Sequence, residues 1–328
     1  MKFAENALGL VGNTPLVRLN RVVPKGVATV LAKVEAFNPG GSVKDRIGLK
    51  MIEKAEREGK LKPGGTIVEP TSGNTGVGLA IACAIKGYKL ICVMPDKVPM
   101  EKRRLLELLG AEIFICPTSA GPDDPASYYQ VSDRLVKERH AYKPNQYDNL
   151  ANPEAHYETT GPEVWRDTEG KVDAFVCGVG TGGTISGTGR FLKEKNKGVR
   201  VVGVDPVGSI LKEAFETGSF KAKPKTYLID GIGEDFIPGA VNFQIIDEFI
   251  RVPDPDAYSM AMRMAREEGL MVGSSAGAAV VAANQVAQCL GRGKTVVVLL
   301  PDSGERYLSK LNKEWFAQKG LTMPQLAR

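Results

Sequence analysis

The sequence predicts an α/β protein with doubly wound parallel sheets, and three observations support this fold class. Short β-branched runs alternate along the chain with longer segments of helical period. The runs are continuously apolar, which is typical of strands buried on both faces of a parallel sheet. The length of 328 residues exceeds what one hydrophobic core usually organises, so the sequence indicates two domains.

The expected strands are short apolar runs bounded by turns or by helical segments. They span residues 29–35, 66–69, 90–94, 112–116, 174–178, 200–205, 245–252 and 295–300. The expected helices carry apolar residues at helical spacing. They span residues 44–58, 75–85, 100–109, 126–138, 162–167, 184–195, 256–268 and 276–290. The Pro- and Gly-rich segments 117–125 and 218–239 are expected to be loops, and the second is long enough to suggest a function.

The composition is that of an ordinary globular protein. Lys and Arg number 43 against 38 Asp and Glu, and the two signs are interspersed, so no nucleic-acid partner is expected. No secretory leader and no run of about 20 apolar residues is visible, so we expect a cytoplasmic protein without membrane contact. The five cysteines lie scattered in apolar runs and are expected to pack in the core. With only His140 and His156 beside them, no metal site is expected.

The first candidate segment, residues 38–46 (NPGGSVKDR), places a Gly-Gly turn before an expected helix. Ser42 is the expected N-cap, and Asp45 follows three residues later as its partner in a capping box. Lys44 then lies in the first helical turn, where the positive potential of the helix start favours a neutral amine that can attack a carbonyl. Taken alone, Lys44 also fits a solvated surface lysine.

The second segment, residues 69–76 (EPTSGNTG), is a polar turn between an expected strand and an expected helix. Backbone N–H groups and hydroxyls gathered at a helix start suit a small anion, such as an amino-acid carboxylate. A well-capped strand-to-helix turn explains the segment equally well.

The third segment, residues 177–184 (CGVGTGGT), also follows a strand and opens a helix. Its glycines let backbone donors approach phosphate oxygens closely, and Thr181 and Thr184 add hydroxyl donors. Because so many glycines in a tight turn are conformationally costly, we expect this turn to have a use.

A dinucleotide site is a rival interpretation of the same turn. Gly178, Gly180 and Gly183 have GxGxxG spacing. Asp205 ends the next expected strand, where a ribose-binding acid would stand. An NAD-binding oxidoreductase is therefore a distant alternative, although it gives Lys44 no role.

A fourth segment, residues 272–277 (VGSSAG), is a small-residue turn before a helix, which alone indicates only an N-cap. Read in order with the other three, it makes the sequence resemble the cysteine synthase and cystathionine β-synthase family of pyridoxal-phosphate enzymes, fold type II. The resemblance runs from GNTPL at 12–16 to PDSGERY at 301–307. It implies a homodimer of chains with two doubly wound parallel-sheet domains, as in tryptophan synthase β. It places residues 1–40 plus 152–328 in a larger cofactor-binding domain and 41–151 in a smaller, mobile substrate-binding domain.

The resemblance also implies roles for individual residues. Lys44 looks like the lysine that forms the Schiff base with pyridoxal 5′-phosphate and later moves the Cα proton. Asn74 matches the residue that hydrogen-bonds the cofactor's 3-hydroxyl, and Ser275 matches the residue that faces the pyridine nitrogen. The phosphate cup is matched by Gly180, Thr181, Gly182, Gly183 and Thr184. The substrate site is matched by Thr71, Ser72, Gly73, Thr75 and Gln146, with Gly231 in a loop over the substrate.

These roles imply a β-replacement reaction on small amino-acid and thiol substrates. A neutral hydroxyl at the pyridine nitrogen makes the ring a weaker electron sink than a carboxylate would, which favours loss of a β-substituent over transamination. The reaction would pass through an aminoacrylate to which a thiol adds. The segments 157–160, 205–210, 236–238 and 301–303 resemble the cystathionine β-synthase branch.

On that branch, L-serine or O-acetyl-L-serine and L-homocysteine would give cystathionine. The alternative is a cysteine synthase that uses O-acetyl-L-serine and sulfide. No haem is expected, because the chain shows neither the haem-binding extension nor the regulatory domain of the animal enzymes.

Glu234 directly follows Gly231-Ile232-Gly233, at a position where animal members of the branch carry an aromatic residue. Its carboxylate is a candidate for attracting the ammonium group of homocysteine near the mouth of the site. A solvated loop carboxylate is the alternative.

Overall fold

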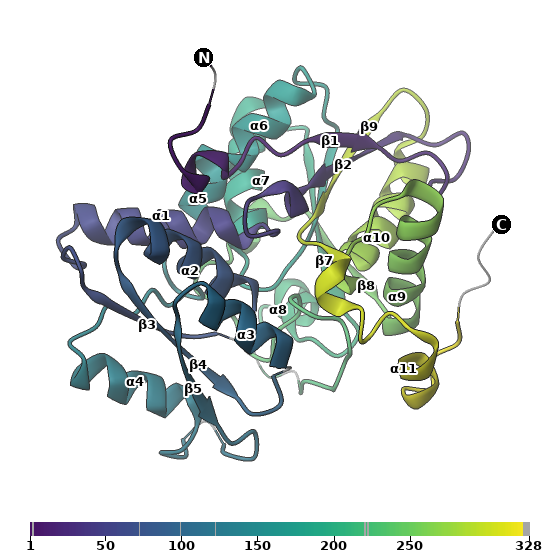
Figure 1. Cartoon of the computed structure of the whole chain (residues 1–328). Coiled ribbons are helices and arrows are strands. Elements are labelled where there is room, and N and C mark those ends of the chain that lie inside the picture. The colour runs from purple at the N-terminus through teal and green to yellow at the C-terminus, as the bar shows by residue number, and fades with distance from the viewer. Residues whose placement is uncertain are drawn as a thin grey trace. The chain divides into compact units, whose positions relative to one another are not determined.

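The computed structural model describes residues 1, 3–71, 73–98, 100–121, 123–219, 221 and 223–323. It divides the chain into two compact units. The first unit comprises Met1–Gly12 and Asn38–Asn152, and the second comprises Asn13–Phe37 and the residues from Pro153 onward. Each unit has its own parallel sheet with interleaved helices, which confirms the predicted fold class (Figure 1).

The first unit is built on a three-stranded parallel sheet in the order β3-β4-β5. The strands are β3 (Thr66–Pro70), β4 (Lys89–Pro95) and β5 (Glu112–Cys116), and the helices are α1 (Lys44–Arg57), α2 (Asn74–Lys86), α3 (Met100–Leu108) and α4 (Tyr128–Glu138). Helix α4 lies on one side of this sheet, and α1 and α2 lie on the other (Figure 1). Val68, Ile91 and Val93 of the sheet are buried against Val131 and Leu135 of α4.

The second unit contains a six-stranded sheet in the order β1-β2-β9-β6-β7-β8. All strand pairs are parallel except the antiparallel edge pair of β1 and β2. The strands are β1 (Leu16–Arg18), β2 (Thr29–Val34), β6 (Ala174–Gly178), β7 (Arg200–Pro206), β8 (Glu248–Val252) and β9 (Thr295–Leu300). The helices are α5 (Ala151–Glu158), which begins in the first unit, α6 (Thr160–Asp167), α7 (Gly183–Lys195), α8 (Leu211–Thr217), α9 (Asp254–Arg263), α10 (Ser274–Leu290) and α11 (Lys313–Gln318).

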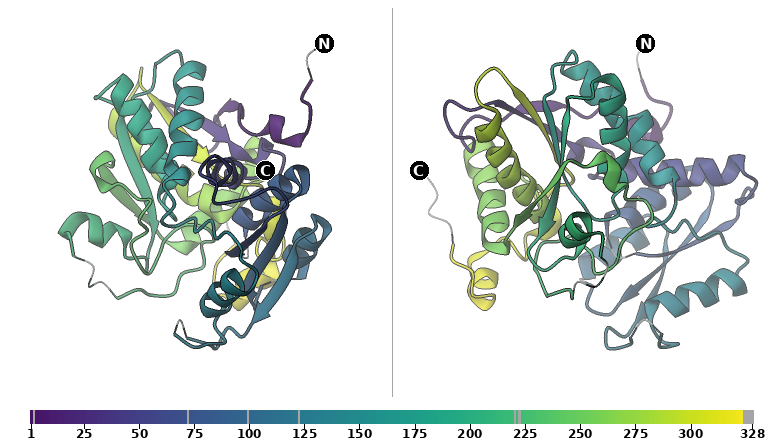
Figure 2. Two further views of the ribbon diagram at one scale, coloured as in Figure 1. Left: turned by 90° about the vertical axis from the view of Figure 1, so that its left-hand side faces the viewer. Right: turned by 180° about the vertical axis from the view of Figure 1, so that it is seen from behind.

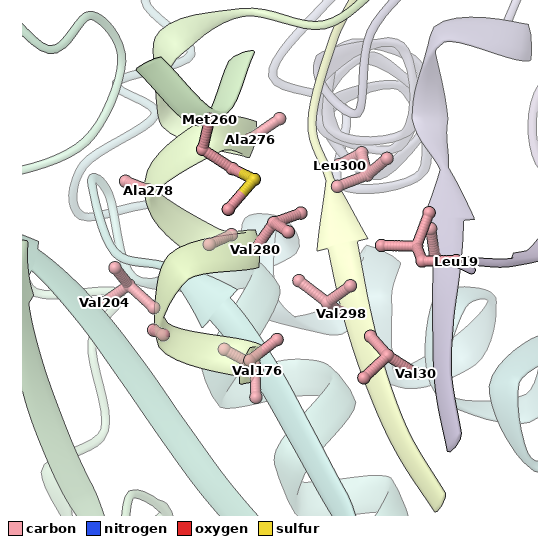
Figure 3. Close-up of a cluster of buried hydrophobic side chains, with 14 of the residues drawn as sticks. Leu19, Val30, Val176, Val204, Met260, Ala276, Ala278, Val280, Val298 and Leu300 are labelled. Atoms are coloured by element: carbon pink, nitrogen blue, oxygen red, sulfur yellow. The ribbon is translucent and has the colours of Figure 1, made fainter. Parts of the chain in front are cut away.

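Helices cover both faces of the six-stranded sheet, with α9 and α10 on one face and α6 and α7 on the other (Figure 2). Helix α10 is rich in Ala and Val, so it approaches β9 and β6 closely. Val280 of α10 faces Val176 and Val298 of these strands in the core (Figure 3). Burying each such side chain contributes about 1.5–3 kcal/mol.

Several elements differ from the sequence expectations. Strand β1 was not expected, because three residues are too few to show a pattern. The expected strand 245–252 begins later, at Glu248, because Phe243–Ile245 forms a 3₁₀ turn capped by the side chain of Asn242. The expected helix 256–268 ends in a π-helical turn, Met264–Glu268. The short helices α5, α8 and α11 were also not expected.

The prediction that all five cysteines are core residues is wrong for Cys289, which is exposed on α10, while the other four are buried. Among the described helices, none has the length and apolar character that crossing a membrane requires.

Candidate active site

Lys44 is the first residue of α1 and is half-buried. The capping box predicted for this helix is wrong, because the N-cap is Val43 and makes no side-chain cap hydrogen bond. The hydroxyl of Ser42 instead accepts the N–H of Lys44 at 3.2 Å, and the carboxylate of Asp45 accepts the N–H of Gly40 at 2.5 Å. The chain turns back through a left-handed residue between Gly40 and Ser42, so the N–H of Gly40 reaches Asp45.

The starts of α1 and α2 are held together by an unusually close helix contact. A Cβ on Gly78 of α2 would lie 2.6 Å from the carbonyl oxygen of Lys44, and a Cβ on Gly48 of α1 would lie 2.5 Å from the carbonyl carbon of Gly78. Gly78 follows Asn74 by one helical turn, and Gly48 follows Lys44 by one turn, so each pair shares a helix face. The two glycines therefore set the first turn of α1, which carries Lys44, against Gly78, one helical turn beyond Asn74.

The start of α2 collects most of the residues predicted for the substrate carboxylate. Its N-cap is Gly73, which provides no side-chain cap, and the first N–H groups of a helix have no partner within the helix. The hydroxyl of Thr75 donates to Oε1 of Gln146 at 2.6 Å, and Thr71 is buried at the end of β3. The predicted residue Ser72 lies outside the described residues. Backbone donors and hydroxyls at this helix start suit a carboxylate.

In the second unit, the glycine-rich turn after β6 fits a phosphate group. The N-cap of α7 is Gly182, which has a φ of 81° and provides no side-chain cap. A Cβ there would lie 2.4 Å from Cβ of Val241, and a Cβ on Gly180 would lie 2.8 Å from the carbonyl oxygen of Gly231. Only glycine fits both positions. Thr181, Gly183 and Thr184 are buried at the same helix start, which adds hydroxyl donors to its backbone N–H groups.

Ser275 and Gly231 lie on segments that are linked to this turn. Ser275 is the second residue of α10 and is buried. Its neighbour Ser274 accepts the N–H of Asp230 through Oγ at 3.1 Å, which fixes the loop that carries Gly231 to the start of α10. The same loop is tied to the glycine turn, because the N–H of Gly233 donates to the carbonyl of Val179 at 2.7 Å.

Asp205, the acid of the dinucleotide interpretation, is not placed to bind a ribose. It is fully buried, and its carboxylate accepts the N–H of Lys212 at 3.0 Å in the turn that opens α8. Burial raises the pKa of its carboxyl, and hydrogen bonds from the turn oppose the rise. The side chain therefore stabilises a turn, and the glycine turn loses the partner that a dinucleotide site needs.

Two polar residues that the sequence reasoning did not assign contact predicted site residues. Buried His156 bridges two hydroxyls, with Nδ1 2.8 Å from Oγ1 of Thr160 and Nε2 3.1 Å from Oγ1 of Thr184. Buried Glu69 accepts the backbone N–H of Gln146 at 3.2 Å. Glu69 opens the motif EPTSGNTG, so an acid at a strand end was a visible signal, whereas nothing local in the sequence marks His156.

Comparison with known proteins gives concordant results. Residues 7–302 match the family described as pyridoxal-phosphate dependent enzyme. Cystathionine β-synthase from Rattus norvegicus is 47% identical over 330 aligned positions, which cover 99% of this chain and 58% of the rat protein. Cysteine synthase from Staphylococcus aureus is 49% identical over 310 positions, which cover 94% of this chain and 96% of that protein.

The fold is similar to a solved structure as well. The crystal structure of a hydrogen sulfide-producing enzyme from Fusobacterium nucleatum has a TM-score of 0.87 and 39% sequence identity, covering 94% of this chain and 99% of that one. The chain therefore spans nearly the whole of two of these three relatives and little more than half of the rat protein.

Proposed function

Because this chain belongs to the family of pyridoxal-phosphate dependent enzymes, we propose that it catalyses a β-replacement in which L-serine or O-acetyl-L-serine and L-homocysteine give cystathionine. The observation that carries this proposal is the close contact of α1 with α2. It sets the turn of α1 that carries Lys44 against Gly78, one helical turn from the polar start of α2, where an amino acid would be held by its carboxylate. A lysine amine next to a carboxylate site is what chemistry at the Cα of an amino acid requires.

In each unit, the residues that match the family would bind a different part of the cofactor. The N–H groups at the start of α7, with the hydroxyls of Thr181 and Thr184, would hold its phosphate. Lys44 would hold it covalently through Nζ, Asn74 would hydrogen-bond its 3-hydroxyl, and Ser275 would face its ring nitrogen. Bound pyridoxal phosphate supplies an electron-withdrawing ring that stabilises negative charge at the substrate Cα.

The chain's own groups would then bind the substrate and move its proton. Thr71, Thr75 and Gln146 would bind the substrate carboxylate, which leaves the β-substituent as the part that changes. Lys44 would take the Cα proton and return it after the thiol has added. The Ser275 hydroxyl cannot keep the ring nitrogen charged as a carboxylate would, which favours β-elimination over transamination.

The second substrate distinguishes two candidate activities. The 47% identity to the rat cystathionine β-synthase and the branch-like segments favour L-homocysteine. The 49% identity to a cysteine synthase of nearly the same length favours sulfide. We propose homocysteine first, with cysteine synthesis as the second candidate. The domain limits, the homodimer and the cytoplasmic location expected from the sequence stay predictions.

The deciding experiment offers the purified holoenzyme both first substrates, each with homocysteine or with sulfide, and identifies the product by mass spectrometry. Cystathionine formed with a kcat/KM well above that for cysteine supports the proposal. Cysteine as the dominant product selects the second candidate. Turnover with none of the four pairs would refute both.

A further inference from the structure

Glu69 is a buried carboxylate to which the proposed reaction gives no task. It lies one residue before the end of β3 and is 1% exposed. Burial raises the pKa of its carboxyl to about 7, against the opposing effects of two backbone N–H donors and of Lys143. Burying a carboxylate is costly unless its hydrogen bonds are good, so its partners indicate its use.

The two oxygens of Glu69 hold successive N–H groups of a turn that is remote in sequence. Oε2 accepts from Asn145 at 2.9 Å and Oε1 accepts from Gln146 at 3.2 Å. Asn145 has a φ of 51°, in the left-handed region that residues other than glycine rarely adopt. Successive N–H groups at such a residue form a small concave site for an anion, and the carboxylate of Glu69 occupies it.

This contact fixes Gln146, which is held at three points. Its N–H donates to Glu69, its carbonyl accepts from Nδ2 of Asn152 at 2.8 Å, and its side-chain Oε1 accepts from Thr75 at 2.6 Å. Glu69 is also the last but one residue of β3, and Thr71 directly follows that strand. One carboxylate therefore joins the two segments that carry the predicted substrate-carboxylate residues.

From this geometry we infer that Glu69 is a positioning residue: its ionised carboxylate holds the turn at 145–146 and so sets the affinity of Gln146 and Thr75 for the carboxylate of the amino-acid substrate. The inference rests on the proposed function and deepens it. Protonation would turn one carboxylate oxygen into a hydroxyl, which is a weaker acceptor, so one of the two hydrogen bonds to the turn would be weakened.

The other groups near Glu69 do not offer the same switch. Burial raises the pKa of the thiol of Cys92, which pairs with Glu69 in register on β4, and burial also raises the pKa of the Tyr142 hydroxyl. Both shifts lead away from neutral pH. Lys143 forms an ion pair at 2.5 Å with Asp133 of α4, the helix that packs on β3. The thiol of Cys92 and the hydroxyl of Tyr142 therefore stay uncharged near pH 7.

The test compares Glu69→Gln with wild-type holoenzyme. The amide keeps the size of the side chain, but its NH₂ group opposes one backbone N–H. We expect the KM for serine or O-acetylserine to rise roughly tenfold at pH 8, as expected for one lost hydrogen bond to a charged group, while kcat and the KM of the thiol change less than about twofold. In wild type, the KM of the amino acid should rise as the pH falls below about 7, and in the variant this rise should be absent.

Glu268→Gln is the matched control. Its carboxylate also accepts successive backbone N–H groups, those of Asn20 at 2.8 Å and Val22 at 2.9 Å among them, but it belongs to the second unit, whereas Thr75 and Gln146 belong to the first. This variant should keep the wild-type KM and its pH dependence.

Hydrogen exchange gives a readout that needs no turnover. The N–H groups of Asn145 and Gln146 should exchange faster in Glu69→Gln than in wild type, and faster in wild type below pH 7 than the pH effect on intrinsic exchange predicts. If wild type is active and Glu69→Gln shows unchanged KM, pH profile and exchange, the positioning role is wrong while the proposed function stands. If wild type is inactive with all substrates, the proposed function fails, and exchange alone still decides the role of the turn. If Glu69→Gln does not fold, the pH dependence of the KM and of the exchange in wild type decides whether Glu69 positions the turn.

Discussion

Replacing Gly182 by alanine tests whether the turn that opens α7 is shaped for a phosphate. An alanine at φ 81° adopts the left-handed region, which costs about 1–2 kcal/mol. Its Cβ would also lie 2.4 Å from Cβ and 2.6 Å from Cα of Val241, so the backbone must shift. Overpacking of this kind costs roughly 1–3 kcal/mol. The free energy of unfolding of the apoprotein should therefore fall by about 2–5 kcal/mol.

The matched control is Gly218→Ala in the same unit. Gly218 ends α8 with a φ of 64°, and none of the described residues has an atom within 4 Å of a Cβ built on it. The free energy of unfolding of this variant should fall by only about 1–2 kcal/mol, which is the cost of the left-handed conformation. The difference between the two variants isolates the steric part of the Gly182 effect.

The assay pairs denaturant unfolding of the apoproteins with titration by pyridoxal phosphate. A backbone shift at Gly182 displaces the N–H groups at the helix start, so the Kd for the cofactor should rise by roughly tenfold or more, as for the loss of one or two hydrogen bonds to a charged group. Gly218→Ala should bind as wild type does. If Gly182→Ala keeps wild-type cofactor affinity despite its lower stability, the turn does not hold the phosphate.

Three further outcomes are expected. Lys44→Ala should lower kcat/KM on the order of 10³-fold or more without unfolding the protein. The control Lys60→Ala, which removes an exposed lysine paired with Glu58, should match wild type. Wild-type turnover in Lys44→Ala would contradict the role of Lys44. Glu234→Ala should raise the KM for homocysteine roughly threefold, as for the loss of an exposed charge pair, and should leave the KM for sulfide unchanged. An unchanged KM for homocysteine would show that Glu234 does not attract its ammonium group. Burial raises the folded-state pKa of Glu69 from 4.5 to about 7, so between these pH values the folded protein binds more protons than the unfolded chain. The wild-type free energy of unfolding should therefore fall by up to about 3 kcal/mol as the pH rises from 4.5 through 7. Denaturant titrations at several pH values should show no such fall in Glu69→Gln, and equal slopes in both proteins would contradict the assignment.

The last of these outcomes separates stability from function at Glu69. Ionisation strengthens its two hydrogen bonds to the turn at 145–146, but it also places a charge in the interior. The turn is thus held best where the carboxylate destabilises the fold most.

The parts of the fold that the sequence predicts well are those where burial itself leaves a pattern. The runs at 174–178 and 295–300 are strands over the same residues in the structure, because a strand buried on both faces is apolar along nearly its whole length. The run at 112–116 is also a strand over the same residues, although it is an edge strand with Ile115 exposed. Strand β1 has no such pattern, since its three residues are held by antiparallel pairing with β2, as at Leu16 opposite Lys33. The π-helical turn at Met264–Glu268 continues the helical pattern of the residues before it, so the sequence does not show its altered hydrogen bonding.

In the candidate site, the sequence predicts the local turn motifs but not the contacts that orient them. The four turn motifs are local, and each one lies at the start of a helix as predicted. The contacts that orient them join residues far apart in the chain, as Glu69 does with Asn145 and His156 with Thr184. Such partners depend on the completed sheet and its crossovers, which no local motif encodes.

Covalent trapping shows whether Lys44 is the residue that holds the cofactor. The purified holoenzyme is reduced with borohydride, digested and mapped by mass spectrometry, with Lys44→Ala treated in parallel. A phosphopyridoxyl group is expected on Lys44 in the wild-type digest and on no lysine of the variant. A cofactor adduct on a different lysine, or cofactor bound without any adduct, would contradict this role of Lys44.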